Sequence, residues 1–257
     1  MDVEIQLEKL NKSLRGKQVL CDLDLEVRRG ETLVVIGRSG TGKSVLLKLI
    51  IGLVAADSGR LFVREKDVTD PHGPNREAIR GLFGMVFQDA ALLASLTIAD
   101  NVGLGLRENR LYPEAEIERI VAEKLEMVGL KEAAQALPSQ LSGGMRKRAG
   151  LARALAMNPE IILYDEPTAG LDPIMSDNVD SVIKEMKERL RMTSIVVTHD
   201  MISAFGIADR IAMLDAGSVV EIGVPDEIRD SRNPIIQEFI AREGAFIRSG
   251  RNKEGRT

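Results

Sequence analysis

Hydrophobic and polar residues alternate along the first thirty residues of the chain. Apolar side chains occupy every second position in segments 3–7 and 23–27. A period of two is typical of strands that bury one face. We therefore predict two antiparallel strands joined by a turn at Arg15-Gly16.

Further along, apolar residues form continuous runs, which are typical of strands that a parallel sheet buries on both faces. Helical periodicity follows in segments 145–157 and 174–190, and the second begins after Asp172-Pro173, a favourable cap and first helical residue. Strands alternating with helices predict an α/β fold with helices on both faces of the sheet. The predicted buried strands lie at residues 33–36, 161–163, 194–197 and 211–214.

Three other segments complete the predicted organisation. Residues 89–159 show no strand pattern, so we predict a helical insertion there. Asp215–Ser218 lies between two apolar runs and predicts a late hairpin. After Ala241 the chain carries five basic and two acidic residues, which predicts a basic, partly disordered tail over 241–257. A solvated terminus and a contact with an anionic partner both explain such a tail.

The composition narrows the class of protein. The 257 residues, 44% of them hydrophobic, suffice for one large domain or two small ones. A net charge of −4, only 3% aromatic residues and no tryptophan argue against a nucleic-acid partner. The single Cys21 rules out an intramolecular disulfide and fits a reducing compartment. No apolar run reaches the roughly 18 residues of a membrane span, and the N-terminus lacks a signal-peptide pattern, so we expect a cytoplasmic protein.

The segment Gly37–Ser44 reads GRSGTGKS and matches the phosphate-binding pattern G-x-x-x-x-G-K-[ST]. It lies between a predicted buried strand and an apolar helix, the context that this motif requires. Its backbone N–H groups would surround phosphate oxygens, Lys43 would reach the β- and γ-phosphates, and the Ser44 hydroxyl would ligate Mg²⁺. The predicted nucleotide-binding residues are Gly37, Arg38, Ser39, Gly40, Thr41, Gly42, Lys43 and Ser44.

Two carboxylates follow the apolar run at 161–163, where the carboxyl end of a strand places ligand-binding residues. We expect Asp165 to hold Mg²⁺ together with the nucleotide, and Glu166 to accept a proton from an attacking water. His199 ends another predicted strand and is placed to hydrogen-bond a γ-phosphate. His72, the only other histidine, lies between Pro71 and Gly73 and is interpreted as a loop residue.

The segment Leu141–Met145 reads LSGGM, precedes an amphipathic helix and closely resembles the LSGGQ signature of the ABC ATPases, with Met145 in place of glutamine. Four other residues match the family in order. Gln88 resembles the Q-loop glutamine, Glu166 the catalytic glutamate, Asp172 the D-loop aspartate and His199 the switch histidine. The resemblance covers the chain up to about residue 240.

The resemblance implies an ATPase domain over residues 1–240, with a RecA-like P-loop core, an antiparallel β subdomain and a helical subdomain at about 89–159. It implies binding of ATP and Mg²⁺ and hydrolysis of ATP. It also implies a head-to-tail dimer in which each ATP lies between the phosphate loop of one copy and the signature of the other, so that Ser142, Gly143, Gly144 and Asp172 contact nucleotide. A second anion site at a helix N-terminus fits such an arrangement. The implied catalytic residues are Glu166, His199, Lys43 and Gln88, and the implied Mg²⁺ ligands are Ser44, Gln88 and Asp165.

One departure from the family concerns the base. The family usually stacks adenine on an aromatic residue near the first strands, but no aromatic residue precedes Phe62 here. We expect Lys12, Leu14 or Val19 to cover the base instead, through apolar or cation–π contact. This replacement predicts that GTP is accepted more readily than usual.

Local sequence features narrow the resemblance further. The LSGGM signature, the sequence at 146–154, and segments 86–92 and 100–108 look like those of the ATPases of Mla/Mce-type lipid transporters. Such complexes pair two ATPases with two multi-span permeases and a lipid-binding MCE protein, and some carry a small STAS-domain subunit. The resemblance therefore implies phospholipid transport, with the chain bound peripherally on the cytoplasmic side of the inner membrane.

Three alternatives stay open. They are the ATPase of another ABC importer or exporter, a soluble ABC ATPase without a permease, and a nucleotide-binding regulator that does not hydrolyse ATP. The presence of Glu166 and His199 argues against the last. The transported molecule and the direction of transport are not encoded in these motifs.

Overall fold

The structure, a computed structural model, describes residues 2–251 of the chain. The chain forms two compact units, one of residues 1–79 and 195–257 and the other of residues 80–194. Within the described residues, no helix is long and apolar enough to cross a lipid bilayer.

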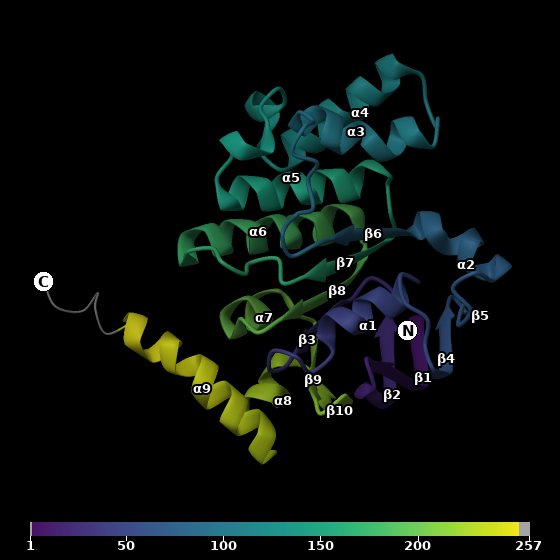
Figure 1. The fold of residues 1–257 in the computed structure, drawn as a ribbon. Helices are drawn as coiled ribbons and strands as arrows, with labels where there is room; N and C mark the ends of the chain where they lie inside the picture. Colours follow the sequence, from purple (N-terminus) through teal and green to yellow (C-terminus); the bar gives the residue numbers. More distant parts are fainter. Residues whose placement is uncertain (1, 252–257) are drawn as a thin grey trace, which may run out of the picture. The chain divides into compact units, whose positions relative to one another are not determined.

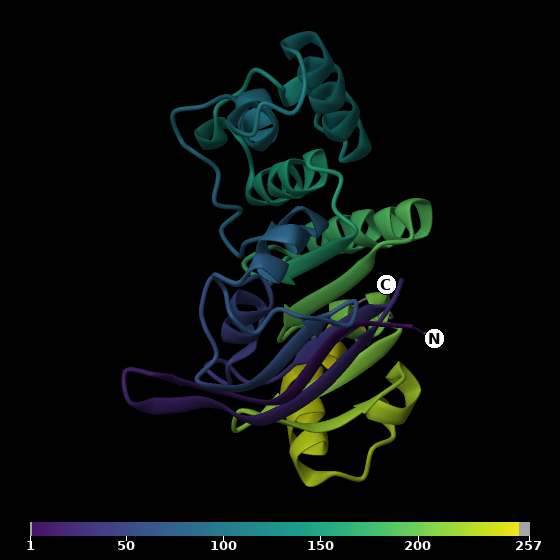
Figure 2. The ribbon, with the colours of Figure 1, turned by 90° about the vertical axis from the view of Figure 1, so that its right-hand side faces the viewer.

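The first unit begins with the predicted antiparallel pair. Strands β1 (Val3–Leu14) and β2 (Lys17–Arg28) form the long two-stranded ribbon of Figure 2, with Arg15-Gly16 in the turn. Most of their alternate apolar residues are buried, as the period of two predicts. Val3 is an exception at 36% exposed, whereas Glu4 is buried, where it pairs with Arg64 at 2.6 Å. Two further strands, β4 (Ser58–Val63) and β5 (Lys66–Asp67), which the sequence pattern does not reveal, complete a sheet of order β2-β1-β4-β5.

The second sheet has the strand order β10-β9-β3-β8-β7-β6. β3 (Thr32–Ile36) is buried along its whole length and pairs in parallel with β9 (Arg210–Asp215). β10 (Ser218–Gly223) pairs antiparallel with β9, which confirms the predicted hairpin. The remaining strands are β8 (Thr193–Thr198), β7 (Ile161–Asp165) and β6 (Phe83–Val86), of which β6 and β7 pair in parallel.

Helices of the first unit flank its strands in Figure 1. The last of them, α9, carries the buried side chains Ile236 and Phe239 near its start. The domain boundary expected at residue 240 falls inside this helix, which continues to Arg251, and residues 252–257 of the expected basic tail lie outside the described part. The helices are α1 (Lys43–Ile50), α2 (Pro74–Ile79), α7 (Met201–Ile207), α8 (Pro225–Arg229) and α9 (Pro234–Arg251).

The second unit contains the segment 89–159, in which the structure has helices and no strand. Its helix α5 (Gly143–Ala156) starts two residues before the predicted segment 145–157, because the Ser142 hydroxyl caps its first turn. Asp172 caps α6 in the same way, with Pro173 as the first helical residue, as predicted. The helical elements are η1 (Arg80–Leu82), α3 (Ile98–Glu108), α4 (Glu114–Met127), η2 (Lys131–Ala133), η3 (Pro138–Gln140), α5 (Gly143–Ala156) and α6 (Pro173–Leu190).

Candidate functional site

The predicted phosphate loop joins β3 to α1. Gly42 is the N-terminal cap of α1, with a φ of 106°, and no side chain caps this helix end. A Cβ at Gly42 would lie 2.7 Å from Leu20 Cδ2 and 3.0 Å from the Val19 carbonyl oxygen, so both the dihedral and the packing require glycine. The loop therefore presents backbone N–H groups of the first helical turn, the arrangement that binds anions.

Two hydrogen-bonded residues shape the inside of this loop. Lys43 is only 6% exposed, and its Nζ donates to the carbonyl oxygens of Gly37 (2.7 Å) and Arg38 (3.1 Å). The Thr41 hydroxyl donates to the same Arg38 carbonyl oxygen at 2.9 Å. A buried ammonium group at the N-terminus of a helix attracts negative charge strongly, because little water screens it.

The loop fits a nucleotide with Mg²⁺. At Gly37 a Cβ would overlap the carbonyl oxygen of Leu214, so the backbone approaches too closely for any side chain. Ser44 lies in the first turn of α1, one residue after Lys43, and supplies a hydroxyl oxygen, a ligand type that Mg²⁺ accepts beside phosphate oxygens. The remaining loop residues, Arg38, Ser39 and Gly40, lie between β3 and α1 as the motif requires.

In the second unit, the two predicted carboxylates lie at the end of β7. Asp165 is the last residue of the strand and is 6% exposed. Glu166 follows with a φ of 49°, in the left-handed region that side chains other than glycine rarely adopt. Such outliers cluster at functional sites, where surrounding contacts hold the backbone in place.

Gln88 follows β6 in the same unit and has an exposed side chain. Its carbonyl oxygen accepts a hydrogen bond from Lys147 Nζ at 2.5 Å, and the Glu166 carbonyl oxygen accepts from the same Nζ at 3.0 Å. Lys147 lies on α5 and is 8% exposed. The segments that carry Gln88 and Glu166 are therefore brought together through Lys147, a residue to which the sequence motifs assign no role.

The signature residues open α5. The Ser142 hydroxyl accepts a hydrogen bond from the Met145 N–H at 3.3 Å. Gly143 and Gly144 lie close to the segment that starts α6. A Cβ on Gly143 would lie 3.2 Å from Leu171 Cδ2, and one on Gly144 would lie 3.2 Å from Met175 Sδ. The signature and the segment containing Asp172 thus pack against each other inside this unit.

Asp172 and the two histidines lie at the positions in the fold that the sequence predicts. Asp172 is exposed and accepts a hydrogen bond from the Met175 N–H at 3.0 Å. His199 directly follows β8 and is exposed, and Asp200 caps the next helix, α7. His72 lies in a turn between β5 and α2.

The three candidates for covering the base differ in their surroundings. Lys12 Nζ lies 2.6 Å from Asp57 Oδ1, and this hydrogen bond holds the pKa of the Asp57 carboxyl below its usual range. Leu14 is 40% exposed at the end of β1. Val19 lies beside the phosphate loop, since its carbonyl oxygen and Cγ1 are 3.0 and 3.1 Å from where a Cβ of Gly42 would be. Of the three, Val19 is the one placed against the loop.

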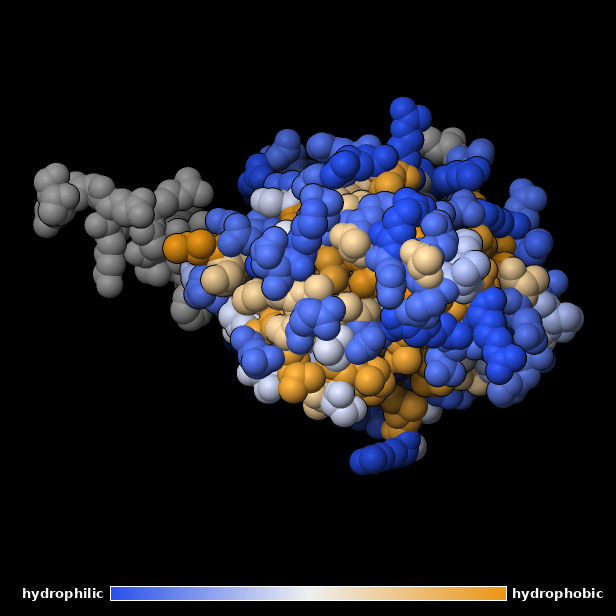
Figure 3. Space-filling view, turned by 90° about the horizontal axis from the view of Figure 1, so that it is seen from above, coloured by the Kyte–Doolittle hydropathy of each residue, from blue (hydrophilic) through white to orange (hydrophobic). Residues whose placement is uncertain are grey.

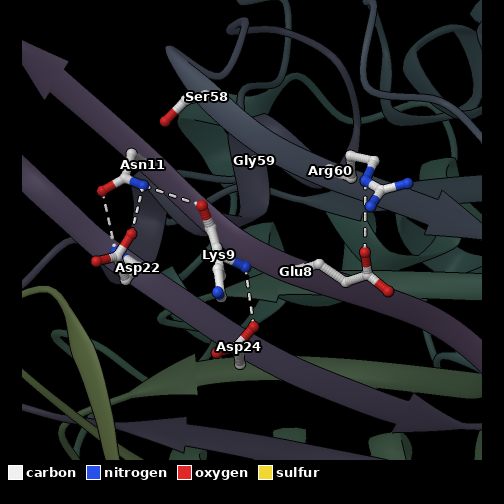
Figure 4. Close-up of a pocket in the computed structure, with 8 residues that line it drawn as sticks. All are labelled: Glu8, Lys9, Asn11, Asp22, Asp24, Ser58, Gly59 and Arg60. Carbon is white, nitrogen blue, oxygen red and sulfur yellow. Dashed lines mark hydrogen bonds and ion pairs between the residues drawn. The ribbon is translucent and has the colours of Figure 1, made fainter.

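A polar hollow on the four-stranded sheet, of about 550 Å³, is separate from these motifs (Figure 4). Its carboxylates are paired within the sheet. Asp22 accepts from the Asn11 amide and Asp24 from the Lys9 N–H, both at 2.8 Å, and Glu8 lies 3.5 Å from Arg60. These polar groups satisfy one another's hydrogen bonds and charges, so we interpret the hollow as a structural feature of the bulged strands.

A family model described as "ABC transporter" matches residues 20–169, more than half of the chain. A "probable ribonucleotide transport ATP-binding protein mkl" from Mycobacterium leprae is 39% identical over 240 residues, which are 93% of this chain and 69% of that protein. A "methionine import ATP-binding protein MetN" from Xanthomonas euvesicatoria is 42% identical over 228 residues, or 87% and 68%. A "sulfate/thiosulfate import ATP-binding protein CysA" from Nitrosomonas europaea is 39% identical over 246 residues, or 94% and 67%.

Similar solved structures also come from ABC transporters. The chain is similar to cbiO1 from Clostridium perfringens, part of the ABC transporter complex cbiONQ, with a TM-score of 0.82 and 29% identity over 96% of this chain and 98% of that chain. It is also similar to the ATP-binding cassette MJ0796 in a dimeric post-hydrolysis state bound to ADP and Pi. There the TM-score is 0.78 and the identity 32%, over 86% of this chain and 98% of that chain. These similarities confirm the predicted fold class and ATPase activity. The chain belongs to the ABC transporter family, as an ATP-binding subunit that hydrolyses ATP with Mg²⁺.

Proposed function

We propose that this subunit powers phospholipid transport through a separate membrane permease of the Mla/Mce type. The observation that carries the proposal is the LSGGM signature followed by the basic residues Arg146, Lys147 and Arg148. The names of the relatives cover ribonucleotide, methionine and sulfate/thiosulfate transport at 39% to 42% identity. Because these sequence identities are similar, overall identity does not distinguish between the transported molecules. The proposal therefore rests on the local signature sequence.

In the proposed cycle, the phosphate loop binds ATP through Lys43 and the N-terminus of α1. Ser44, Gln88 and Asp165 would hold Mg²⁺, which would supply positive charge beside the phosphates. Glu166 accepts a proton from the attacking water, and His199 hydrogen-bonds the γ-phosphate. The left-handed backbone of Glu166 supports this assignment, because strain concentrates where a side chain must be aimed.

We propose that two copies close head-to-tail over ATP, with Ser142, Gly143, Gly144 and Asp172 of one copy facing the nucleotide of the other. The surface near the signature supports this arrangement. Ile174 is 74% exposed and is adjacent in the chain to Met175, which packs on Gly144. An isologous interface would cover the Ile174 side chain. It would also place the N-terminus of α5, which suits binding of an anion, against the ATP of the other copy.

The permease would dock on the second unit, in the segment that follows Gln88. Asn101 is fully buried and fixes this segment, donating to the carbonyl oxygens of Leu93, Leu96 and Thr97 while accepting from the Leu93 N–H. The Leu93 side chain itself is 47% exposed. In Figure 3, apolar side chains likewise interrupt a mostly hydrophilic surface. A segment whose backbone is firmly held and whose Leu93 side chain is exposed, five residues after Gln88, suits the transmission of nucleotide state to a partner.

The experiment that tests the cargo is extraction of the tagged chain from its own membranes in mild detergent, followed by identification of bound subunits and lipids. The proposal expects a multi-span permease, an MCE-type lipid-binding subunit, phospholipid and in some complexes a STAS-domain subunit, all at the cytoplasmic side of the inner membrane. Recovery of a permease with a soluble solute-binding protein would instead favour a small-molecule importer, the second candidate that the names CysA and MetN suggest. Recovery of soluble partners alone would contradict both.

A further inference from the structure

Helix α5 holds two neighbouring segments of the second unit through long basic side chains. Lys147 Nζ donates to the carbonyl oxygens of Gln88 and Glu166, and Arg153 donates to those of Ala90 (2.7 Å) and Ala91 (2.5 Å). Lys147 is buried, whereas Arg153 is half-buried. Of these two side chains, Lys147 is the one that donates to the segment that carries Glu166.

The surroundings of Lys147 are unusual for a buried lysine. Burial lowers the pKa of its ammonium group, while the carboxylates of Asp89, Glu166 and Asp165 oppose that shift. An ammonium group in this position makes charge-assisted hydrogen bonds, which are shorter and stronger than neutral ones. Its removal would take one donor from two part-buried carbonyl oxygens and one positive charge from the neighbourhood of three carboxylates.

The backbone of Glu166 is the part of this arrangement most sensitive to such a loss. Its φ of 49° is sparsely populated for a residue with a side chain, so neighbouring contacts have to maintain it. Its carbonyl oxygen accepts from the Ala169 N–H at 3.2 Å and from Lys147 Nζ at 3.0 Å. The second contact comes from helix α5, so it ties the Glu166 backbone to a helix that lies apart from it in the chain.

We propose that Lys147 is a positioning residue for ATP hydrolysis, which holds the Glu166 backbone in its left-handed conformation and links it to the Gln88 segment. The proposal rests on the role of Glu166 proposed above. A change in the Gln88 segment would move Lys147 and, through it, the carboxylate that activates water. Positioning errors of about 1 Å lower catalytic rates by about 100-fold, so the link is able to gate turnover.

The test is steady-state ATP turnover of the full chain with Mg²⁺, together with fluorescent-ATP titration, for four variants. Lys147→Met should lower kcat by about 10- to 100-fold while KM and nucleotide affinity change less than about threefold. Lys147→Arg, which keeps donors and charge, should recover most of the turnover. Lys124→Met is a matched control, because it removes an equally buried ammonium group that pairs with Glu123 on helix α4. This variant should leave kcat unchanged. Arg153→Met should likewise retain kcat, because it loses contacts to Ala90 and Ala91 alone.

Each other outcome counts against the proposal. Wild-type kcat in Lys147→Met would overturn it, and so would an equal loss in Lys124→Met or Arg153→Met. If Lys147→Met fails to fold, the test uses Lys147→Arg instead. A folded Lys147→Arg protein that does not retain most of the wild-type kcat would also overturn the proposal. Glu166→Gln, measured in parallel, separates the two proposals. Unchanged turnover there would contradict the role of Glu166 itself, whereas slow Glu166→Gln with normal Lys147→Met would contradict only the role of Lys147.

Discussion

Arg38 of the phosphate loop is paired with Glu238 of the C-terminal helix α9, with 2.9 Å between Nη2 and Oε2. Both side chains are about half exposed, and Glu238 also pairs with Arg242 at 2.8 Å. A carboxylate beside a loop that binds phosphates repels them, and it also holds a guanidinium group that would otherwise attract them. The helix therefore acts electrostatically on the loop.

From this pair we predict that Glu238→Gln tightens ATP binding. The change should be about two- to fivefold, because exposed ion pairs contribute at most about 1 kcal/mol. Titrations at low and high salt would check it, since the difference should shrink as ions screen the charges. Asp226→Asn, which removes an exposed partner of Arg229 on α8, is the matched control. Equal affinity of Glu238→Gln and the wild type at low salt would contradict the prediction.

Lys43→Ala should abolish nucleotide binding while the protein stays folded. Lys43 Nζ donates to two carbonyl oxygens of the loop and supplies its buried positive charge. Loss of such a charge costs about 2–5 kcal/mol, which raises Kd by about 30-fold or more. Fluorescent-ATP titration measures the affinity, and circular dichroism checks the fold. Lys48→Ala, on the exposed side of the same helix, should bind normally.

Glu166→Gln should slow ATP turnover by about 10²- to 10⁴-fold with little change in ATP affinity, as expected for loss of a general base. Turnover is measured as phosphate release and affinity by titration. An exposed glutamate of the same unit, Glu132, serves as control when changed to Gln. Full activity of the Glu166 variant would refute the assignment.

The slow Glu166→Gln variant also allows a test of the proposed dimer. With ATP bound it should form dimers that size-exclusion chromatography with light scattering detects. Adding Ile174→Arg should prevent dimer formation without lowering thermal stability, because Ile174 is 74% exposed in one copy. Ile202→Arg, at a position that is 55% exposed in the other unit, should still dimerise. Dimers that survive Ile174→Arg would place the interface elsewhere.

Base selectivity should be weak. Val19 lies against the phosphate loop, and an apolar contact of this kind distinguishes poorly between purine bases, unlike a hydrogen-bonded readout. We expect kcat/KM for ATP and GTP to agree within about tenfold. Val19→Tyr should tighten binding of both nucleotides, since one base–aromatic stack contributes about 1–3 kcal/mol. A strong preference of the wild type for ATP would show that another residue reads the base.

Most of the α/β core could be predicted from the sequence because its strands are continuous apolar runs. β6 could not be, since it has only four residues and includes Gly84. A Cβ at Gly84 would lie 3.0 Å from both the Ala154 carbonyl oxygen and Pro159 Cγ, so packing from distant parts of the chain makes this strand possible. Local pattern carries no trace of such packing.

The candidate site also contains residues that local sequence reveals and residues whose role depends on the fold. Residues of the phosphate loop and the signature are recognisable because their motifs are contiguous. Lys147 was missed, although a signal was present. Helical spacing puts it on one face of α5 with Gly144, Leu151 and Leu155, which are all buried, and a lysine on a buried face needs a partner. The identity of that partner follows only from the fold.

The cap at Ser142 has a consequence for the energetics of association. Its hydroxyl already fixes the first turn of α5, so the signature segment is ordered before a second copy binds. Ordering a flexible loop at an interface would consume part of the interaction free energy as lost conformational entropy. A preorganised helix end avoids that cost, so in the proposed dimer a larger fraction of the free energy of the ATP contacts would remain for closing the two copies and driving the proposed permease.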